Sequence, residues 1–186
     1  MKKHIVLLLS LIVFQSCGTE ITPKPKPYLT LQYSNPSYSK HNFNCPYSFE
    51  ISNLATTHLK DNCWLKIEYP HLKATLHITY RSVNNNLNEI LTEIEKLTFE
   101  HTIKADNINA IPYENFDKKV FGKLYSVEGD VATNIQFRVT DSVKHVLAGA
   151  LYFYAKPNYD SILPAVKYLE KDIIHLVETI EWKDEI

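Results

Sequence analysis

The stretch ATLHITYRSVNNNLNEILTEIEKLTFEH, residues 74–101, contains the change of hydrophobic period that decides the fold class. In residues 74–80 apolar and polar side chains alternate, which is typical of a half-buried strand. The asparagines at 84–86 suit the start of a helix. We therefore expect a strand followed by an amphipathic helix that runs to about Lys104 and lies across a sheet. The apolar face of that helix, at spacings of three and four, is Leu87, Ile90, Leu91, Ile94, Leu97 and His101.

Segments on both sides of this stretch also alternate apolar and polar residues. Upstream, we expect a strand pair around the turn Pro70-His71, and downstream a hairpin around Asp141-Ser142. The strands expected in addition to 74–80 are 28–33, 47–51, 63–69, 108–113, 119–127, 134–140 and 143–155.

A second helix is expected after Asn158, with Asp160 or Ser161 as its N-cap and Pro164 in its first turn, where proline is tolerated. Its expected buried face is Ile162, Val166, Leu169, Ile173, Leu176, Val177 and Ile180. The order of strands, helix, strands and closing helix predicts an α+β fold, in which a mainly antiparallel β-sheet is packed by two amphipathic helices. This order is loosely similar to that of the PsbP-like sandwich.

The N-terminus has the anatomy of a secretory signal peptide. Lys2 and Lys3 precede an apolar run at residues 5–14, and the small Ser16 precedes Cys17. The run is about half of the roughly 20 residues that a membrane-spanning helix needs. A cysteine directly after a small residue points to a bacterial lipoprotein signal, in which the sulfur is acylated and the cysteine becomes the new N-terminus. An ordinary cleaved signal with an incidental cysteine is the alternative.

A spacer follows the cysteine. Residues 22–27 read TPKPKP, and alternating proline and lysine predict an extended polyproline segment that holds a domain off a membrane. The expected organisation is a lipoprotein signal peptide at 1–16, a lipidated Cys17 and Pro/Lys spacer at 17–27, and a single globular domain at 28–186.

Charge and glycine content exclude several classes of function. Loss of Lys2 and Lys3 on processing takes the formal net charge from −1 to −3, and acids and bases are interspersed, so no nucleic-acid partner is expected. The chain has only four glycines, which cannot build a glycine-rich phosphate-binding loop.

With Cys17 assigned to lipid, Cys45 and Cys63 remain. Outside the cytoplasm such a pair favours a disulfide, which would stabilise the fold by roughly 3 kcal/mol on the chain-entropy model. Two buried free thiols are the alternative. A zinc site is less favoured, because no second pair of ligands lies at a suitable spacing.

No catalytic motif is present, and we expect no catalytic residue, cofactor or metal. Asp141 and His145 are four residues apart, but in a hairpin this spacing does not bring two side chains together as it does on a helix. His101 is expected to be a boundary histidine of the first helix. The tyrosines, with Trp64 and Trp182, could anchor a protein partner, although half-buried strands also use tyrosine for packing.

Several blocks of the chain resemble the gliding motility lipoprotein GldD family of Bacteroidota. They are residues 23–27, 45–50, 62–64, 80–86, 101–106, 139–143 and 152–164. The resemblance covers nearly the whole mature chain, in order. It implies a non-enzymatic accessory of the gliding apparatus and of the associated type IX secretion system. Its expected partners are the membrane, reached through the lipid anchor, and other gliding motility lipoproteins or type IX secretion components.

Within that resemblance only the lipidation cysteine has a role to transfer, and it falls on Cys17. Cys45 and Cys63 match the family pattern, with the bond between them inferred from the residues. In the group of bacteria that the resemblance points to, surface display is associated with an acidic run just after the lipidated cysteine. Here only Glu20 follows closely, so the resemblance implies a domain that faces the periplasm. A competing hypothesis is a periplasmic small-molecule-binding or hydrolytic domain, with a pocket between sheet and helices lined by groups such as His77, Glu100 and His101.

Overall fold

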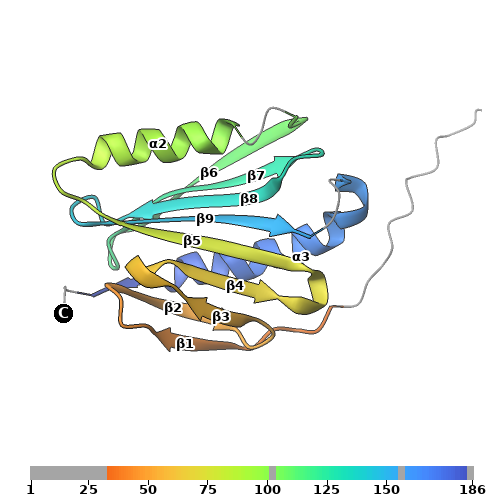
Figure 1. The fold of residues 1–186 in the computed structure, drawn as a ribbon, viewed down its shortest axis with the longest axis horizontal. Coiled ribbons are helices and arrows are strands. Elements are labelled where there is room, and N and C mark those ends of the chain that lie inside the picture. Colours follow the sequence, from red (N-terminus) through yellow and green to blue (C-terminus); the bar gives the residue numbers. More distant parts are fainter. Residues whose placement is uncertain (1–32, 101–103, 155–157, 184–186) are drawn as a thin grey trace, which may run out of the picture.

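Two antiparallel sheets and two helices make up the fold in the computed structural model, which describes residues 33–100, 104–154 and 158–183 (Figure 1). Every strand pairing is antiparallel, which confirms the predicted α+β class. The larger sheet has the order β3 (Thr56–Leu59), β4 (Leu65–Tyr69), β5 (Ala74–Ser82), β9 (His145–Phe153), β8 (Thr133–Thr140), β7 (Val120–Glu128) and β6 (Asn107–Asn115). The smaller sheet has the order β1 (Tyr38–Asn42), β2 (Tyr47–Ser52) and β10 (Glu181–Trp182).

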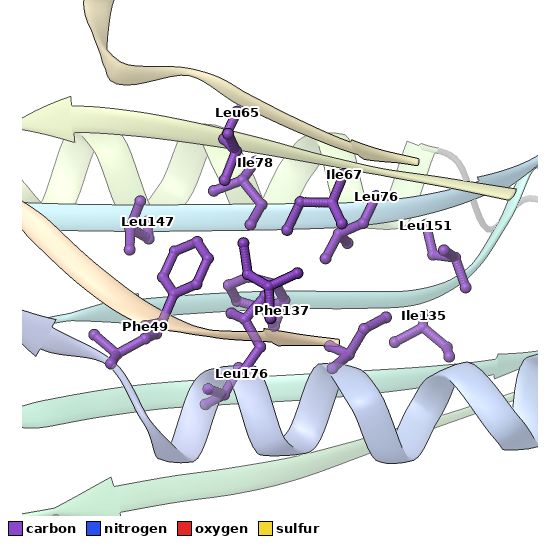
Figure 2. Close-up of a cluster of buried hydrophobic side chains, with 14 of the residues drawn as sticks. Phe49, Leu65, Ile67, Leu76, Ile78, Ile135, Phe137, Leu147, Leu151 and Leu176 are labelled. Atoms are coloured by element: carbon purple, nitrogen blue, oxygen red, sulfur yellow. The ribbon is translucent and has the colours of Figure 1, made fainter. Parts of the chain in front are cut away.

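The core lies between one face of the larger sheet and a second layer made by the smaller sheet and helix α3 (Tyr159–Glu178). Phe49 of β2 and Leu176 of α3 point toward the sheet in Figure 2. Phe137 occupies the space beside Gly149, where an added Cβ would lie 2.2 Å from Cε1 of the ring. Buried side chains from alternate sheet positions are Leu65, Ile67, Leu76, Ile78, Ile135, Leu147 and Leu151.

Helix α3 begins earlier than the sequence indicates. Its N-cap is Asn158, whose side chain accepts a hydrogen bond from the backbone N–H of Ser161, so the expectation of Asp160 or Ser161 as the cap is wrong. Because asparagine is one of the most favourable N-cap residues, the helix begins directly after Asn158. Pro164 therefore lies inside the helix instead of in its first turn, where it removes one backbone hydrogen bond. The predicted buried face is confirmed at Val166, Leu169, Ile173, Leu176, Val177 and Ile180.

Helix α2 (Leu87–Glu100) lies on the other face of the larger sheet, with the strands between it and α3 (Figure 1). That face carries charged side chains, and ion pairs join it to the helix. Glu95 lies 3.5 Å from Arg138 of β8 and 3.8 Å from Lys123 of β7. Glu93 lies 3.2 Å from Arg81 of β5. The helix does lie across a sheet, as predicted, but charged pairs take part in the contact.

The buried face of α2 is smaller than predicted, because Leu87, Leu91 and Ile94 are only half-buried. Ile90 is buried as expected, but Leu97 is 47% exposed, and its neighbour Thr98 is buried instead. The Thr98 hydroxyl donates to the carbonyl of Ile94, which satisfies it inside the contact. The helix is described as far as Glu100, and His101 lies outside the described residues.

Most predicted strands are present, with three differences. Strand β4 starts at Leu65 because residues 61–63 form a short 3-10 helix in which Asn62 and Cys63 have positive φ. Strands β1, β3 and β10 were not predicted. The strand expected at 28–33 falls outside the described residues except for Tyr33, which is not in a strand. Neither helix in the described part of the chain is long and apolar enough to cross a membrane.

Candidate interaction surface

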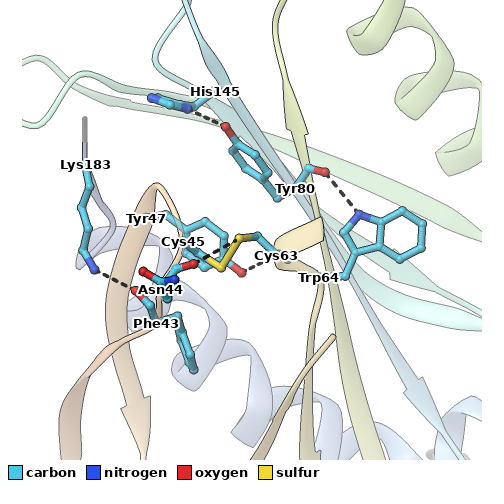
Figure 3. The surroundings of a disulfide bond; sticks show 9 residues. All are labelled: Phe43, Asn44, Cys45, Tyr47, Cys63, Trp64, Tyr80, His145 and Lys183. Atoms are coloured by element: carbon cyan, nitrogen blue, oxygen red, sulfur yellow. Dashed lines mark hydrogen bonds between the residues drawn. A yellow bond between two sulfur atoms is a disulfide. The ribbon is translucent and has the colours of Figure 1, made fainter. Parts of the chain in front are cut away.

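Cys45 and Cys63 form the expected disulfide, with their Cα atoms 5.6 Å apart (Figure 3). The bond joins the segment before β2 to the 3-10 helix before β4, and Cys45 is buried. Beside it, the hydroxyl of Tyr47 donates to the carbonyl of Cys63 at 2.7 Å, and burial raises the pKa of that phenol. The two cysteines therefore act as a structural tie between the two sheets.

A row of rings leads from the disulfide to one end of the molecule. Tyr47 packs against Tyr80, whose hydroxyl lies 2.9 Å from Nδ1 of His145 (Figure 3). The His145 ring stacks on Trp182 of β10 at a centroid distance of 5.4 Å. The indole N–H of Trp182 donates to the carbonyl of Lys119, in the turn between β6 and β7, at 2.9 Å. These contacts hold the last strand and that turn against the core.

The turn between β8 and β9 is held by Asp141. Its Oδ1 accepts hydrogen bonds from the backbone N–H groups of Val143, Lys144 and His145 at 3.0, 2.8 and 2.8 Å. Although burial opposes the charge, these donors lower the pKa of Asp141. The hydrogen bond between Asp141 and His145 therefore uses the backbone N–H of His145, whereas the His145 ring contacts Tyr80 and Trp182. No group of three or more possible metal ligands occurs among the described residues.

These two turns and β10 surround a hollow of about 650 Å³. Two apolar side chains on the turns are strongly exposed, Phe116 at 74% and Val143 at 67%. We call Phe116, Lys118, Lys119, Val143 and Lys144 the lysine tip. The hollow is lined by Asp117, Lys118, Lys119, Asp141, Val143, Lys144, His145, Glu181, Trp182 and Lys183.

Two further hollows lie elsewhere on the molecule. An apolar groove of about 200 Å³ runs between β6 and α3, where Ile111 and Ile174 are partly exposed. A hollow of about 410 Å³ is lined by Tyr33, Tyr69 and Tyr168. Rings of Tyr33 and Tyr168 stack there at 4.7 Å, at the point where the described chain begins.

The residues named for a catalytic pocket are not gathered by the fold. His77 packs edge-on against Tyr152, and Glu100 lies 3.8 Å from Lys96 on its own helix. Neither residue lines any of the three hollows described above. His101 is outside the described residues.

Trp64 and Trp182 were considered as anchors for a protein partner. Each donates its indole N–H to a backbone carbonyl of this chain. Trp64 is 43% exposed and donates to Tyr80, and Trp182 donates to Lys119. The sequence interpretation missed the lysine tip. Its only local signal is Phe116, an apolar residue followed at once by the charged residues 117–119.

A family model described as "Gliding motility lipoprotein GldD" matches residues 18–182, nearly the whole chain. The match begins directly after Cys17 and ends at Trp182 of β10. No curated protein matches the chain.

Proposed function

Because the chain belongs to the gliding motility lipoprotein GldD family, we propose that it supports assembly or stability of the gliding motor and the type IX secretion apparatus through protein–protein contacts. Membership of this family implies a role in gliding motility and attachment to the cell envelope through a lipid anchor. The match over residues 18–182 carries this proposal, because it takes in both the segment after the cysteine and the whole described fold.

Attachment is proposed to depend on Cys17, which lies outside the described residues. In this proposal residues 1–16 are removed, residues 17–27 form the spacer, and residues 28–186 form a domain that faces the periplasm. At about 3.1 Å per residue, a polyproline spacer lets such a domain stand clear of the bilayer and meet other envelope proteins.

A binding role is favoured by how the polar groups are used. The Asp141 carboxylate is engaged by backbone N–H groups, and the His145 ring is part of the row that ends at Trp182. Both residues line the hollow at the lysine tip, where these hydrogen bonds and ring contacts fix their positions. The exposed Phe116 and Val143 provide apolar area of the kind that protein partners cover.

The test is chemical crosslinking followed by co-purification from envelope membranes of gliding cells, with the full lipidated chain as bait. A strain that lacks the chain is the control. We expect known gliding or secretion components to co-purify, and their amounts to fall in the strain that lacks the chain. The proposal is wrong if the chain purifies alone and its loss changes neither those amounts nor motility.

A further inference from the structure

The lysine tip lies at the end of the domain opposite to the point where the described chain begins. Tyr33 shares its hollow with Leu72, just before β5 starts, whereas Ser82 at the other end of β5 pairs with His145 beside the tip. Strand β5 has nine residues, so the two ends are separated by about 30 Å. Figure 1 shows this arrangement, with the C-terminal strand at the end away from the β4–β5 turn. The described chain therefore begins far from the tip.

The hollow at the tip has a positive formal charge, because its lysines outnumber its acids. Three acids and four lysines line the hollow. Asp141 is held by three backbone N–H groups, and Glu181 pairs with Lys40 outside the lining. Of the four lysines, Lys118 and Lys183 donate to the backbone carbonyls of Glu178 and Phe43. Lys40 adds a further positive charge beside Glu181. A ligand with clustered carboxylates complements this charge.

The backbone that carries the tip is fixed before any partner arrives. In the first turn, the N–H of Lys118 donates to Oδ1 of Asn115 at 3.0 Å, and the carbonyl of Lys119 accepts from Trp182. In the second turn, the N–H of Ser142 donates to the hydroxyl of Thr140 at 2.9 Å. Binding to turns that are already ordered costs less conformational entropy than binding to a loop that must fold first.

We propose that the lysine tip docks an acidic segment of another envelope protein, an inference that rests on the proposed function. Carboxylates of the segment meet Lys119 and Lys144, and an apolar side chain of the segment covers Phe116 and Val143. The 650 Å³ hollow between the turns is concave and so suits a protruding segment better than a flat bilayer. The hollow also lies far from Tyr33, and so it faces away from the side on which the proposed lipid anchor joins the domain.

The experiment places a photo-reactive phenylalanine analogue at position 116 of the full lipidated chain in gliding cells. The matched control carries the analogue at Tyr154, which is 63% exposed on the segment after β9. We expect a protein adduct from position 116 alone, mapped by mass spectrometry to a segment rich in Asp and Glu. With Lys119→Glu and Lys144→Glu together, the adduct yield should fall about tenfold.

A second pair, Lys104→Glu with Lys171→Glu, makes the same change of charge at exposed positions away from the tip and should leave the yield unchanged. Four results overturn the inference: no adduct, an adduct with phospholipid, an adduct with residues 184–186 of the same chain, or an equal loss in the control pair. If the adduct is absent while gliding components still co-purify with the chain, the docking inference falls and the proposed function stands. If co-purification also fails, both fall.

Discussion

The hydroxyl of Tyr38 donates a hydrogen bond to Oδ1 of Asp172 at 2.7 Å and so joins β1 to α3 across 134 positions of sequence. Asp172 is only 3% exposed. Burial raises the pKa of this carboxyl, although the hydrogen bonds from Tyr38 and Ser52 act in the opposite direction. The charged form of Asp172 is therefore a cost to the folded state that the Tyr38 contact only partly offsets.

We expect Asp172→Asn to become more stable relative to the wild-type protein as pH rises. The folded carboxyl has the higher pKa, so the folded protein holds this proton more tightly than the unfolded chain does. The free energy of unfolding of the wild-type protein therefore falls as pH rises from the pKa of Asp172 in the unfolded chain to its higher pKa in the folded protein. Asparagine keeps an acceptor for Tyr38 and has no charge to bury.

Urea unfolding between about pH 4 and pH 7 measures the difference in stability between Asp172→Asn and the wild type. The control is Asp61→Asn, at an exposed position on the 3-10 helix. Parallel stability curves for Asp172→Asn and wild type would contradict the expectation.

Removal of the disulfide by Cys45→Ser with Cys63→Ser should lower the free energy of unfolding by roughly 3 kcal/mol, because the bond closes a loop with a sequence separation of 18. Denaturant unfolding measures this loss. Alkylation of the unreduced protein followed by mass spectrometry gives an independent check. Neither cysteine should be labelled, and ready labelling of both would show that the bond is absent from the protein in cells.

Gly149→Ala should destabilise the protein by about 1–3 kcal/mol, because the new Cβ would lie 2.2 Å from the ring of Phe137. The smaller side chain of Phe137→Leu should relieve the clash, so the double variant is expected to lose less than the sum of the two single losses. Thermal or urea unfolding of the four proteins gives this coupling as a double-mutant cycle. Additive losses would show that the Phe137 ring is not what excludes a side chain at position 149.

Cys17→Ala tests the anchor. We expect the variant to lose lipid attachment, so the domain should leave the membrane fraction or remain joined to its uncleaved signal peptide. Fractionation, gel mobility and mass measurement of the N-terminus distinguish these outcomes, and Ser16→Ala, which keeps a small residue before the cysteine, is the matched control. A membrane-bound Cys17→Ala protein of processed size would refute the assignment.

The alternation of residues predicts the strands that have one face on the core. In β5, Leu76 and Ile78 are buried while His77 is exposed, so the pattern reports the environment directly. Strands β1 and β3 were missed because they bury almost no side chain and their sequences show no clear alternation. Strand β10 has only two residues, too few to show a period of two. For α2, the ion pair of Glu95 with Arg138 has no local signature, since it depends on which sheet face the helix meets.

The lysine tip could not be predicted for a similar reason. Lys119 and Lys144 belong to different hairpin turns, and Trp182, which supports the first turn, comes from the last strand of the chain. Each turn alone has the composition of an ordinary solvent-exposed loop. Only the sheet order, which sets β7, β8 and β9 side by side, brings them to one end. The disulfide was predictable because compartment and cysteine count constrain it without knowledge of the fold.

The position of β2 also determines when the molecule can fold. This strand pairs on one side with β1, near the start of the domain, and on the other with β10, where Tyr47 lies opposite Trp182 at the end of the matched region. Because a chain is synthesised from its N-terminus, β1 and β2 are made long before this last partner. Strand β2 then has an open edge beside the fully buried Tyr47 and Phe49. The smaller sheet is therefore complete only once Glu181 and Trp182 are in place, and until then β2 offers an edge on which another chain can pair.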